Sequence, residues 1–235
     1  MPAYTPPVDD ILYLLRRVID TDSLLRLPAF AHVDADTLED VVRAAGAITA
    51  EVIAPINEAC DRVGAQYANG RVTLPPGFVD AFHTFRDQGW PSLVLPEAYG
   101  GQAMPEVVQG ALSEMLNGAS VAFTMMPTTG RAASRVLEAH ATDELRDFYL
   151  PKLVSGEWAT TISMTEPQAG SDIGLARTKA VPRGDGSYAI SGTKIFISFA
   201  DHDAAEQIVN IVLARTEGAP AGVRGLSLFL VPKFL

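Results

Sequence analysis

ATTISMTEPQAGSDIG, residues 159–174, is the stretch at which the sequence changes from one structural pattern to another. Its first five residues are apolar or β-branched, as in a buried strand, and Pro, Gly, Ser and Asp follow soon after. A strand that ends in residues 163–166 before Pro167 presents backbone amides and hydroxyl groups at its end. These groups can bind the polar rim of a flat ligand, but a structural turn capped by Asp172 is about equally consistent with the residues alone.

The chain before this stretch has the apolar spacing of helices. Asp36 followed by Glu39 predicts a capping box, Gly89 is expected to end a helix, and Thr142 is expected to cap one. From the three-and-four spacing of apolar residues we expect helices at 9–19, 36–52, 76–88, 105–117, 127–140 and 143–154. The first part therefore predicts a helical bundle.

The chain after residue 156 consists of short segments rich in Val, Ile, Thr and aromatic residues, separated by Gly, Asp and Pro turns. Besides the opening stretch, these segments are RTKAV (177–181), YAISGTKIFIS (188–198), IVNIVLAR (208–215) and LSLFLV (226–231). RGDGS (183–187) predicts a hairpin connection. We predict an α+β fold, with a helical bundle at 1–156 followed by an antiparallel β domain at 157–235. We expect that domain to be incomplete, because nothing closes or caps its last strand.

The composition favours a protein of the reducing cytoplasm. Lys and Arg total 18 against 28 Asp and Glu, and this net charge of -10 argues against a nucleic-acid or anionic-membrane surface as the main partner. The single cysteine, Cys60, excludes an internal disulfide framework and is expected to be buried. We expect a soluble, cytoplasmic chain, because no signal sequence and no apolar run near the roughly 18 residues of a membrane span is present.

Several kinds of chemistry lack their motifs in this sequence. The four histidines are scattered without metal-ligand spacing, so we expect no metal site. The phosphate-binding patterns GxxxxGK[ST] and GxGxxG after a strand are absent, and so is the GxSxG nucleophile pattern. We therefore expect neither a P-loop nor a Rossmann nucleotide fold, and no serine hydrolase of the GxSxG type.

Four motifs in order resemble those of the acyl-CoA dehydrogenase family. They are LPEAYGG (95–101), YLPKLVSGEW (149–158), MTEPQAGSD (164–172) and YAISGTKIFIS (188–198). The opening YTPPVDDILYLLRRVID and the closing LFLVPKFL further resemble the longer branch of the family, which includes 3-methylmercaptopropionyl-CoA dehydrogenases and some fatty acyl-CoA dehydrogenases. The resemblance covers essentially the whole chain and implies that the family's C-terminal helical domain is absent from it, so we expect more protein to follow Leu235.

The resemblance implies FAD as the cofactor, held by four residues. Met164 and Thr165 would hydrogen-bond the pyrimidine edge of the flavin, through backbone and hydroxyl groups. Phe196 stands where many relatives have a Trp stacked near the flavin ring, and Ser198 where relatives have a hydroxyl directed at flavin N5. Phe keeps the stacking surface of the Trp but lacks its indole donor.

The resemblance also implies substrate contacts. Gly170 and Ser171 would lie against the CoA part of the thioester. Phe123 and Met126 belong to the region that lines the acyl-chain cavity in relatives, although packing inside a helical core explains such residues equally well.

The implied reaction is the α,β-dehydrogenation of an acyl-CoA to a trans-2-enoyl-CoA, with electrons passed to an electron-transfer flavoprotein. The catalytic glutamate of relatives lies beyond Leu235, and Glu166 is read as structural, so no catalytic residue is expected in this chain. The family implies a homo-oligomer for the full-length protein. Two alternatives stay open: an acyl-CoA oxidase of the same fold, and a non-catalytic binding or scaffold subunit.

Overall fold

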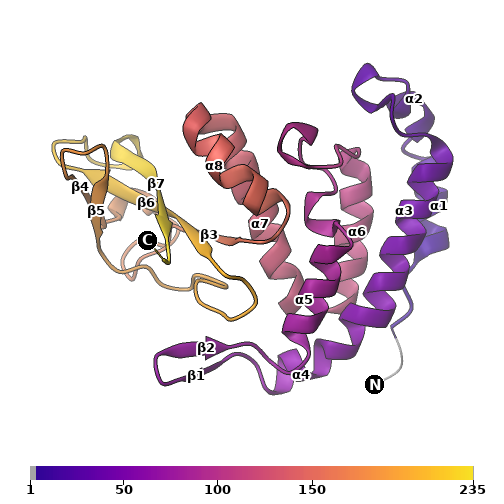
Figure 1. Cartoon of the computed structure of the whole chain (residues 1–235), viewed down its shortest axis with the longest axis horizontal. Helices are drawn as coiled ribbons and strands as arrows, with labels where there is room; N and C mark the ends of the chain where they lie inside the picture. Colours follow the sequence, from indigo (N-terminus) through magenta and orange to yellow (C-terminus); the bar gives the residue numbers. More distant parts are fainter. Residues whose placement is uncertain (1–3, 235) are drawn as a thin grey trace. The chain divides into compact units, whose positions relative to one another are not determined.

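The computed structural model of the chain describes residues 4–234 and divides into two compact units (Figure 1). The first unit runs to Glu157 and also includes His202–Ala204, and the second comprises Trp158–Asp201 and the residues from Ala205 onward. Helices make up most of the first unit and strands most of the second, so the predicted order of a helical part followed by a β part is confirmed.

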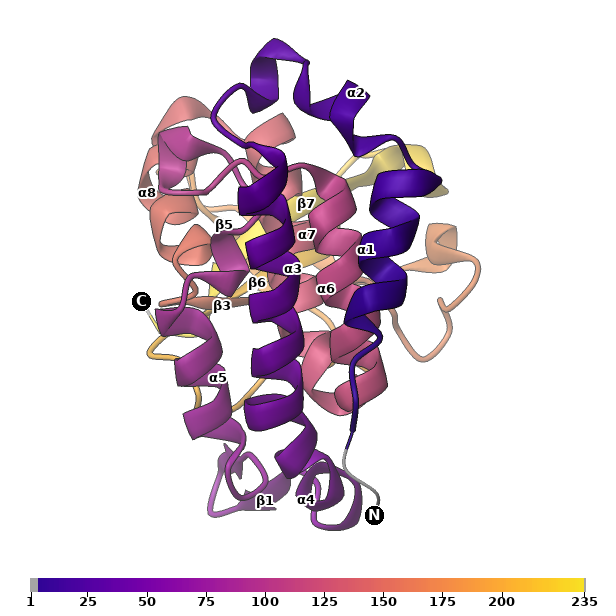
Figure 2. The same ribbon diagram turned by 90° about the vertical axis from the view of Figure 1, so that its right-hand side faces the viewer.

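The first unit is built from α-helices with one small hairpin. Figures 1 and 2 show α3 lying beside α1 and α6, and these pairs are in contact. The bounds of the elements are α1 (Val8–Arg17), α2 (Thr21–Leu25), α3 (Ala35–Ile48), α4 (Asn57–Arg62), β1 (Gln66–Ala68), β2 (Arg71–Thr73), α5 (Phe78–Asp87), α6 (Glu106–Ala119), α7 (Val121–His140) and α8 (Asp143–Val154). The antiparallel β1–β2 hairpin lies in the part of the chain predicted to be helical.

Two helix starts differ from the prediction. The N-cap of α3 is Asp34, whose carboxylate accepts a 2.7 Å hydrogen bond from the Thr37 amide, so the expected capping box at Asp36 is wrong. Helix α7 begins at Val121 after the N-cap Ser120, and Pro127 lies inside it rather than at its start. The predicted Thr142 cap of α8 is confirmed, because its hydroxyl accepts from the Leu145 amide.

The helical core contains a cluster of aromatic rings. The ring of Phe123 on α7 lies 5.2 Å from Phe78 and 5.5 Å from Phe85, both on α5, and all three side chains are fully buried. Aromatic pairs at these separations add to the stability that burial supplies. Cys60 is buried in the same unit, as predicted.

The second unit is a five-stranded sheet. Its strands are β3 (Ala159–Ser163), β4 (Lys179–Pro182), β5 (Tyr188–Ser191), β6 (Ile208–Thr216) and β7 (Leu226–Pro232). β3 and β4 both pair with β6 in parallel, whereas β5 pairs with β4 and β7 pairs with β6 in the antiparallel sense. The sheet is therefore mixed, and the prediction of an antiparallel domain is wrong for two of its four pairings.

The predicted strand at 188–198 is only partly a strand. β5 ends at Ser191, and the chain continues as an irregular loop at 192–199. Phe196 and Phe199 in this loop have φ angles of 58° and 57°, in the left-handed region that is unfavourable for bulky residues and incompatible with a strand. The RGDGS hairpin between β4 and β5 is confirmed by the pairing of Pro182 with Tyr188.

Within residues 4–234, the helices lack the combination of length and apolar composition that a membrane span needs. In the same described part of the chain, no group of three or more His, Cys, Asp and Glu side chains is arranged to hold a metal ion.

Candidate functional site at the end of strand β3

Strand β3 is held to its neighbour β6 by side chains as well as by the backbone ladder. Thr161 donates a 2.6 Å hydrogen bond to the side-chain oxygen of Asn210, and Thr160 donates one of 2.6 Å to the Val209 carbonyl. Both threonines are buried. Because buried polar groups that are fully paired make a structure rigid, these bonds hold β3 in register with β6.

The end of β3 and the loop 192–199 meet directly. The Ile195 amide donates a 3.0 Å hydrogen bond to the Thr165 carbonyl, which joins the two segments predicted to hold the cofactor. The Met164 side chain is 42% exposed, and Thr165 is half-buried. The structure therefore brings Met164 and Thr165 together with the loop that carries Phe196 and Ser198.

The loop carries an exposed aromatic side chain, and the two joined segments carry hydroxyl groups that have no protein partner within residues 4–234. The Phe196 side chain is 89% exposed, the most exposed of the large hydrophobic residues described. Among the described residues, the hydroxyls of Thr165 and Ser198 form no hydrogen bond with another protein group. An aromatic face and unused hydroxyls in neighbouring segments are groups that can bind a flat heterocycle with a polar edge.

Glu166 follows Thr165, and its buried carboxylate holds neighbouring segments together by hydrogen bonds. Its carboxylate is 3% exposed and accepts hydrogen bonds from the amides of Arg177, at 2.7 Å, and Thr178, at 3.0 Å. The Gln168 amide group donates a further bond of 2.6 Å, and Lys194 donates one of 2.9 Å. Four donors on one buried carboxylate fix the turn after β3 to the start of β4.

These contacts determine the charge state of Glu166. Burial alone would raise the pKa of its carboxyl group, but hydrogen bonds from Thr178, the Arg177 amide and Lys194 outweigh burial and lower the pKa to about 2 from 4.5. The Thr178 hydroxyl makes no hydrogen bond of normal geometry with the described part of the chain. The firm partners of the Glu166 carboxylate are therefore the backbone amides of Arg177 and Thr178 and the Lys194 ammonium. Glu166 is ionised at neutral pH.

Gly170 and Ser171 lie on the exposed side of the turn. Glu166 and Ala169 exchange two backbone hydrogen bonds of 3.0 Å, and the Asp172 carboxylate caps the turn by accepting from the Gly174 amide at 3.0 Å. A Cβ atom added at Gly170 would meet nothing within 4 Å. The turn expected from the residues is thus present, and there is open space beside it for a ligand.

Phe123 and Met126 lie in the helical unit and are buried there, with 0% and 4% of their surface exposed. Core packing against α5 accounts for Phe123. Contact of either side chain with an acyl chain stays a prediction.

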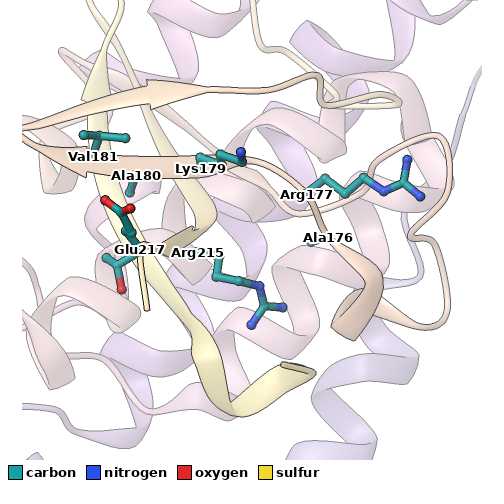
Figure 3. A pocket seen from close by; sticks show the side chains of 8 residues that line it. Ala176, Arg177, Lys179, Ala180, Val181, Arg215 and Glu217 are labelled. Atoms are coloured by element: carbon teal, nitrogen blue, oxygen red, sulfur yellow. The ribbon is translucent and has the colours of Figure 1, made fainter. Parts of the chain in front are cut away.

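A second feature of the β unit is a groove of about 510 Å³ beside β4 and β6 (Figure 3). Three cationic side chains and one carboxylate border it, and Figure 3 shows Glu217 and Arg177 at its opposite ends. The lining residues are Ala176, Arg177, Lys179, Ala180, Val181, Arg215, Thr216 and Glu217, and none of the predicted cofactor or substrate residues is among them. The Arg215 guanidinium is engaged by the backbone carbonyls of Gly174, Pro220 and Gly222.

Lys194 is the residue of this site that the sequence prediction missed. It contacts both Glu166 and the Met164 carbonyl. The available signal was its position: a lone charge between GT and IFIS interrupts an otherwise apolar, β-branched run. A charge in such a run is buried only when it is paired.

The chain matches models of two domains that occur in sequence in one family of proteins. Residues 35–157 match the N-terminal domain and residues 161–234 the middle domain of acyl-CoA dehydrogenases. The chain is 44% identical to a 3-methylmercaptopropionyl-CoA dehydrogenase of Ruegeria pomeroyi, over 99% of this chain and 40% of the relative. It is 37% identical to the broad-specificity linear acyl-CoA dehydrogenase FadE5 of Mycobacterium tuberculosis, over 100% of this chain and 39% of the relative.

Solved structures agree with this result at the level of the fold. The crystal structure of an acyl-CoA dehydrogenase from Geobacillus kaustophilus superposes with a TM-score of 0.71 at 23% identity, over 86% of this chain and 49% of that one. The chain thus spans about two fifths of the length of the curated relatives above and about half of this structure. On the two domain matches, the chain belongs to the acyl-CoA dehydrogenase family.

Proposed function

We propose that the chain is part of a flavin-dependent dehydrogenase that converts an acyl-CoA thioester to a trans-2-enoyl-CoA and passes the electrons to an electron-transfer flavoprotein. The observation that carries this proposal is the hydrogen bond from the Ile195 amide to the Thr165 carbonyl, which joins the two predicted flavin segments. We propose a domain division near residue 156 on the change of sequence pattern there, a cytoplasmic location on the single cysteine, and a homo-oligomeric full-length protein on the family resemblance.

The residues at the end of β3 fit a flavin. Phe196 offers an exposed aromatic face to a planar ring, and Thr165 and Ser198 offer hydroxyls to its polar atoms. Met164 lies beside them with an exposed side chain. A structure of similar fold, at 22% identity, is that of an FAD complex, PigA. When bound, FAD would supply a two-electron acceptor for the hydride that leaves the substrate.

The chemistry requires two bonds to break at adjacent carbons. A base takes the proton from the carbon next to the thioester carbonyl, and a hydride leaves the following carbon, so that the two carbons become doubly bonded. Glu166 is unsuited to be that base, because four donors occupy its carboxylate and its pKa is about 2. Glu166 is therefore not that base, and on the family resemblance we propose that the base comes from outside these 235 residues.

The roles that we propose for this chain are binding and orientation. Gly170 and Ser171 would contact the CoA part of the substrate on the open side of the turn. Phe123 and Met126 would contact the acyl chain. The exposed Phe196 would cover one part of the flavin and exclude water from it.

The test is an FAD titration of the 235-residue chain, followed by flavin fluorescence. We expect binding, and we expect Thr165→Val combined with Ser198→Val to raise the Kd about tenfold or more, because two hydrogen bonds of about 1 kcal/mol each are lost. Thr193→Val is the matched control, since Thr193 lies in the same loop and is exposed. An unchanged Kd in the double variant would remove Thr165 and Ser198 from the site, and a folded chain that binds no FAD would contradict the proposal.

A further inference from the structure

Lys194 joins two segments that are far apart in the sequence. Its ammonium donates a 2.9 Å hydrogen bond to the Met164 carbonyl and another of 2.9 Å to Oε1 of Glu166. The Lys194 side chain is only 11% exposed, and that of Glu166 is 3% exposed. A largely buried cation therefore connects the loop 192–199 to the chain that leaves β3.

The partners of Lys194 are themselves fixed in place. The Glu166 carboxylate is bound by the amides of Arg177 and Thr178, and Met164 directly follows the last residue of β3. Both acceptors are therefore held in place, the Met164 carbonyl by the end of β3 and the Glu166 carboxylate by two backbone amides, so the position of the ammonium determines where the loop lies. We call Lys194, Glu166 and the Met164 carbonyl the clasp.

Stability alone is a weak reason to keep such a clasp. Taking an ammonium and a carboxylate out of water costs several kcal/mol per ion, and apolar residues of similar volume often serve as well for stability. The loop is also already joined to the same segment by the Ile195 amide. In some proteins a buried ion pair instead fixes direction and register, and this is the role that we infer for the clasp.

The loop next to the clasp has a conformation that needs such support. Phe196 is held at a φ of 58° with its side chain 89% exposed, two residues after Lys194. A bulky residue persists in this region of backbone conformation only where its surroundings impose it, and sites that bind ligands often contain such residues. Because the Phe196 side chain is exposed, its burial cannot hold the backbone at this φ angle. The hydrogen bonds of Lys194 and Ile195 are the restraints on this side of Phe196.

We propose that Lys194 is a positioning residue for the flavin. This proposal rests on the function proposed above. The Lys194 ammonium holds the loop so that Phe196 and Ser198 are presented beside Met164 and Thr165 before any ligand binds. Lys194 acts through these four residues and not on the reacting atoms. Removing its charge then weakens flavin binding by releasing the loop, while the β unit stays folded with lower stability.

The first test needs no flavin. Lys194→Met keeps the aliphatic stem and removes the charge, and we expect hydrogen exchange of the Ile195 amide in the 235-residue chain to accelerate about tenfold or more, as the loss of a charged hydrogen bond allows. Lys194→Arg retains a donor and should recover part of the protection. Lys179→Met makes the same chemical change at an exposed lysine of β4 and should leave Ile195 exchange unchanged. Unchanged exchange in Lys194→Met would overturn the clasp.

The second test separates positioning from stability. We expect Lys194→Met to raise the Kd for FAD about tenfold to 100-fold, by analogy with the loss of metal affinity when residues that orient metal ligands are removed, with an unchanged far-ultraviolet circular dichroism spectrum. Val209→Ala, at a fully buried position of β6, should lower the unfolding temperature and leave the Kd unchanged. If the Kd for FAD rose in both variants as the unfolding temperature fell, the weaker binding would reflect lower stability, and the positioning role of Lys194 would be wrong. A wild-type chain that binds no FAD would overturn the proposed function and the flavin role of Lys194 with it, while the exchange measurement still decides whether the clasp holds the loop.

Discussion

Gly101→Ala is expected to destabilise the helical unit by about 3 kcal/mol or more, because the new Cβ would lie 1.9 Å from the Leu95 carbonyl oxygen and 2.3 Å from its carbon. Both are backbone atoms, so no side-chain rotation relieves the overlap. The Gly101 amide also donates to the Pro96 carbonyl at 2.9 Å, which keeps the turn closed at this point. Urea unfolding of the 235-residue chain, followed by circular dichroism, measures the loss.

Gly110→Ala is the matched control for this change. Gly110 lies on the exposed side of α6, and a Cβ there would meet nothing within 4 Å. Alanine inside a helix is favoured over glycine by roughly 0.5–1 kcal/mol, so this variant should gain stability. If Gly101→Ala proved as stable as Gly110→Ala, the close turn at 95–101 would be wrong.

Glu166→Ala is expected to destabilise the β unit by about 3–5 kcal/mol, the usual effect of removing one partner of a buried ion pair. The substitution leaves the Lys194 ammonium buried without its carboxylate and leaves the amides of Arg177 and Thr178 without an acceptor. Glu206→Ala, at an exposed carboxylate in the same unit, should change stability by less than about 0.5 kcal/mol. Equal stabilities of the two variants would contradict the network at Glu166.

The Glu166 carboxylate is expected to make the stability of the β unit depend on pH. The pKa of Glu166 is about 2 in the folded chain against an ordinary value of 4.5, so the folded state favours the charged form. Its stabilisation is fully present above pH 4.5 and is lost as the pH falls toward 2, by roughly 3 kcal/mol in total. Glu166→Gln should remove this part of the acid dependence. Parallel acid unfolding curves for the wild type and Glu166→Gln would show that the carboxylate is not held as described.

The helices were largely predictable because their signals are local. Thr142 caps α8 as expected, since a cap involves only residues three positions apart. The two wrong helix starts arose because two nearby residues in each region carried similar start signals. Asp34 rather than Asp36 caps α3, and α7 continues through Pro127 because Ser120 caps it earlier and its buried face, including Phe123 and Met126, packs in the core.

The β unit was predictable only in part because its pairings join distant residues. The short segments showed where strands lie, but the parallel pairing of Ala159 with Ile208 joins positions that no local pattern connects. The alternation in YAISGTKIFIS predicts a strand through residue 198, yet the strand ends at Ser191. Bonds from Lys194 and Ile195 to the end of β3 hold the remainder as a loop.

By itself, the sequence determined the order of a helical part and a β part, the Thr142 cap of α8, and the motifs that the chain shares with acyl-CoA dehydrogenases. These features depend on residue type and short-range spacing, which the sequence contains directly. The tertiary structure decided the mixed sheet, the role of Glu166 as an acceptor for four donors, and the meeting of Thr165 with the loop that carries Phe196. A buried charge or a paired strand is stabilised only when residues far apart in the sequence contact each other in the folded chain. These features therefore depend on non-local contacts, which local sequence patterns do not contain.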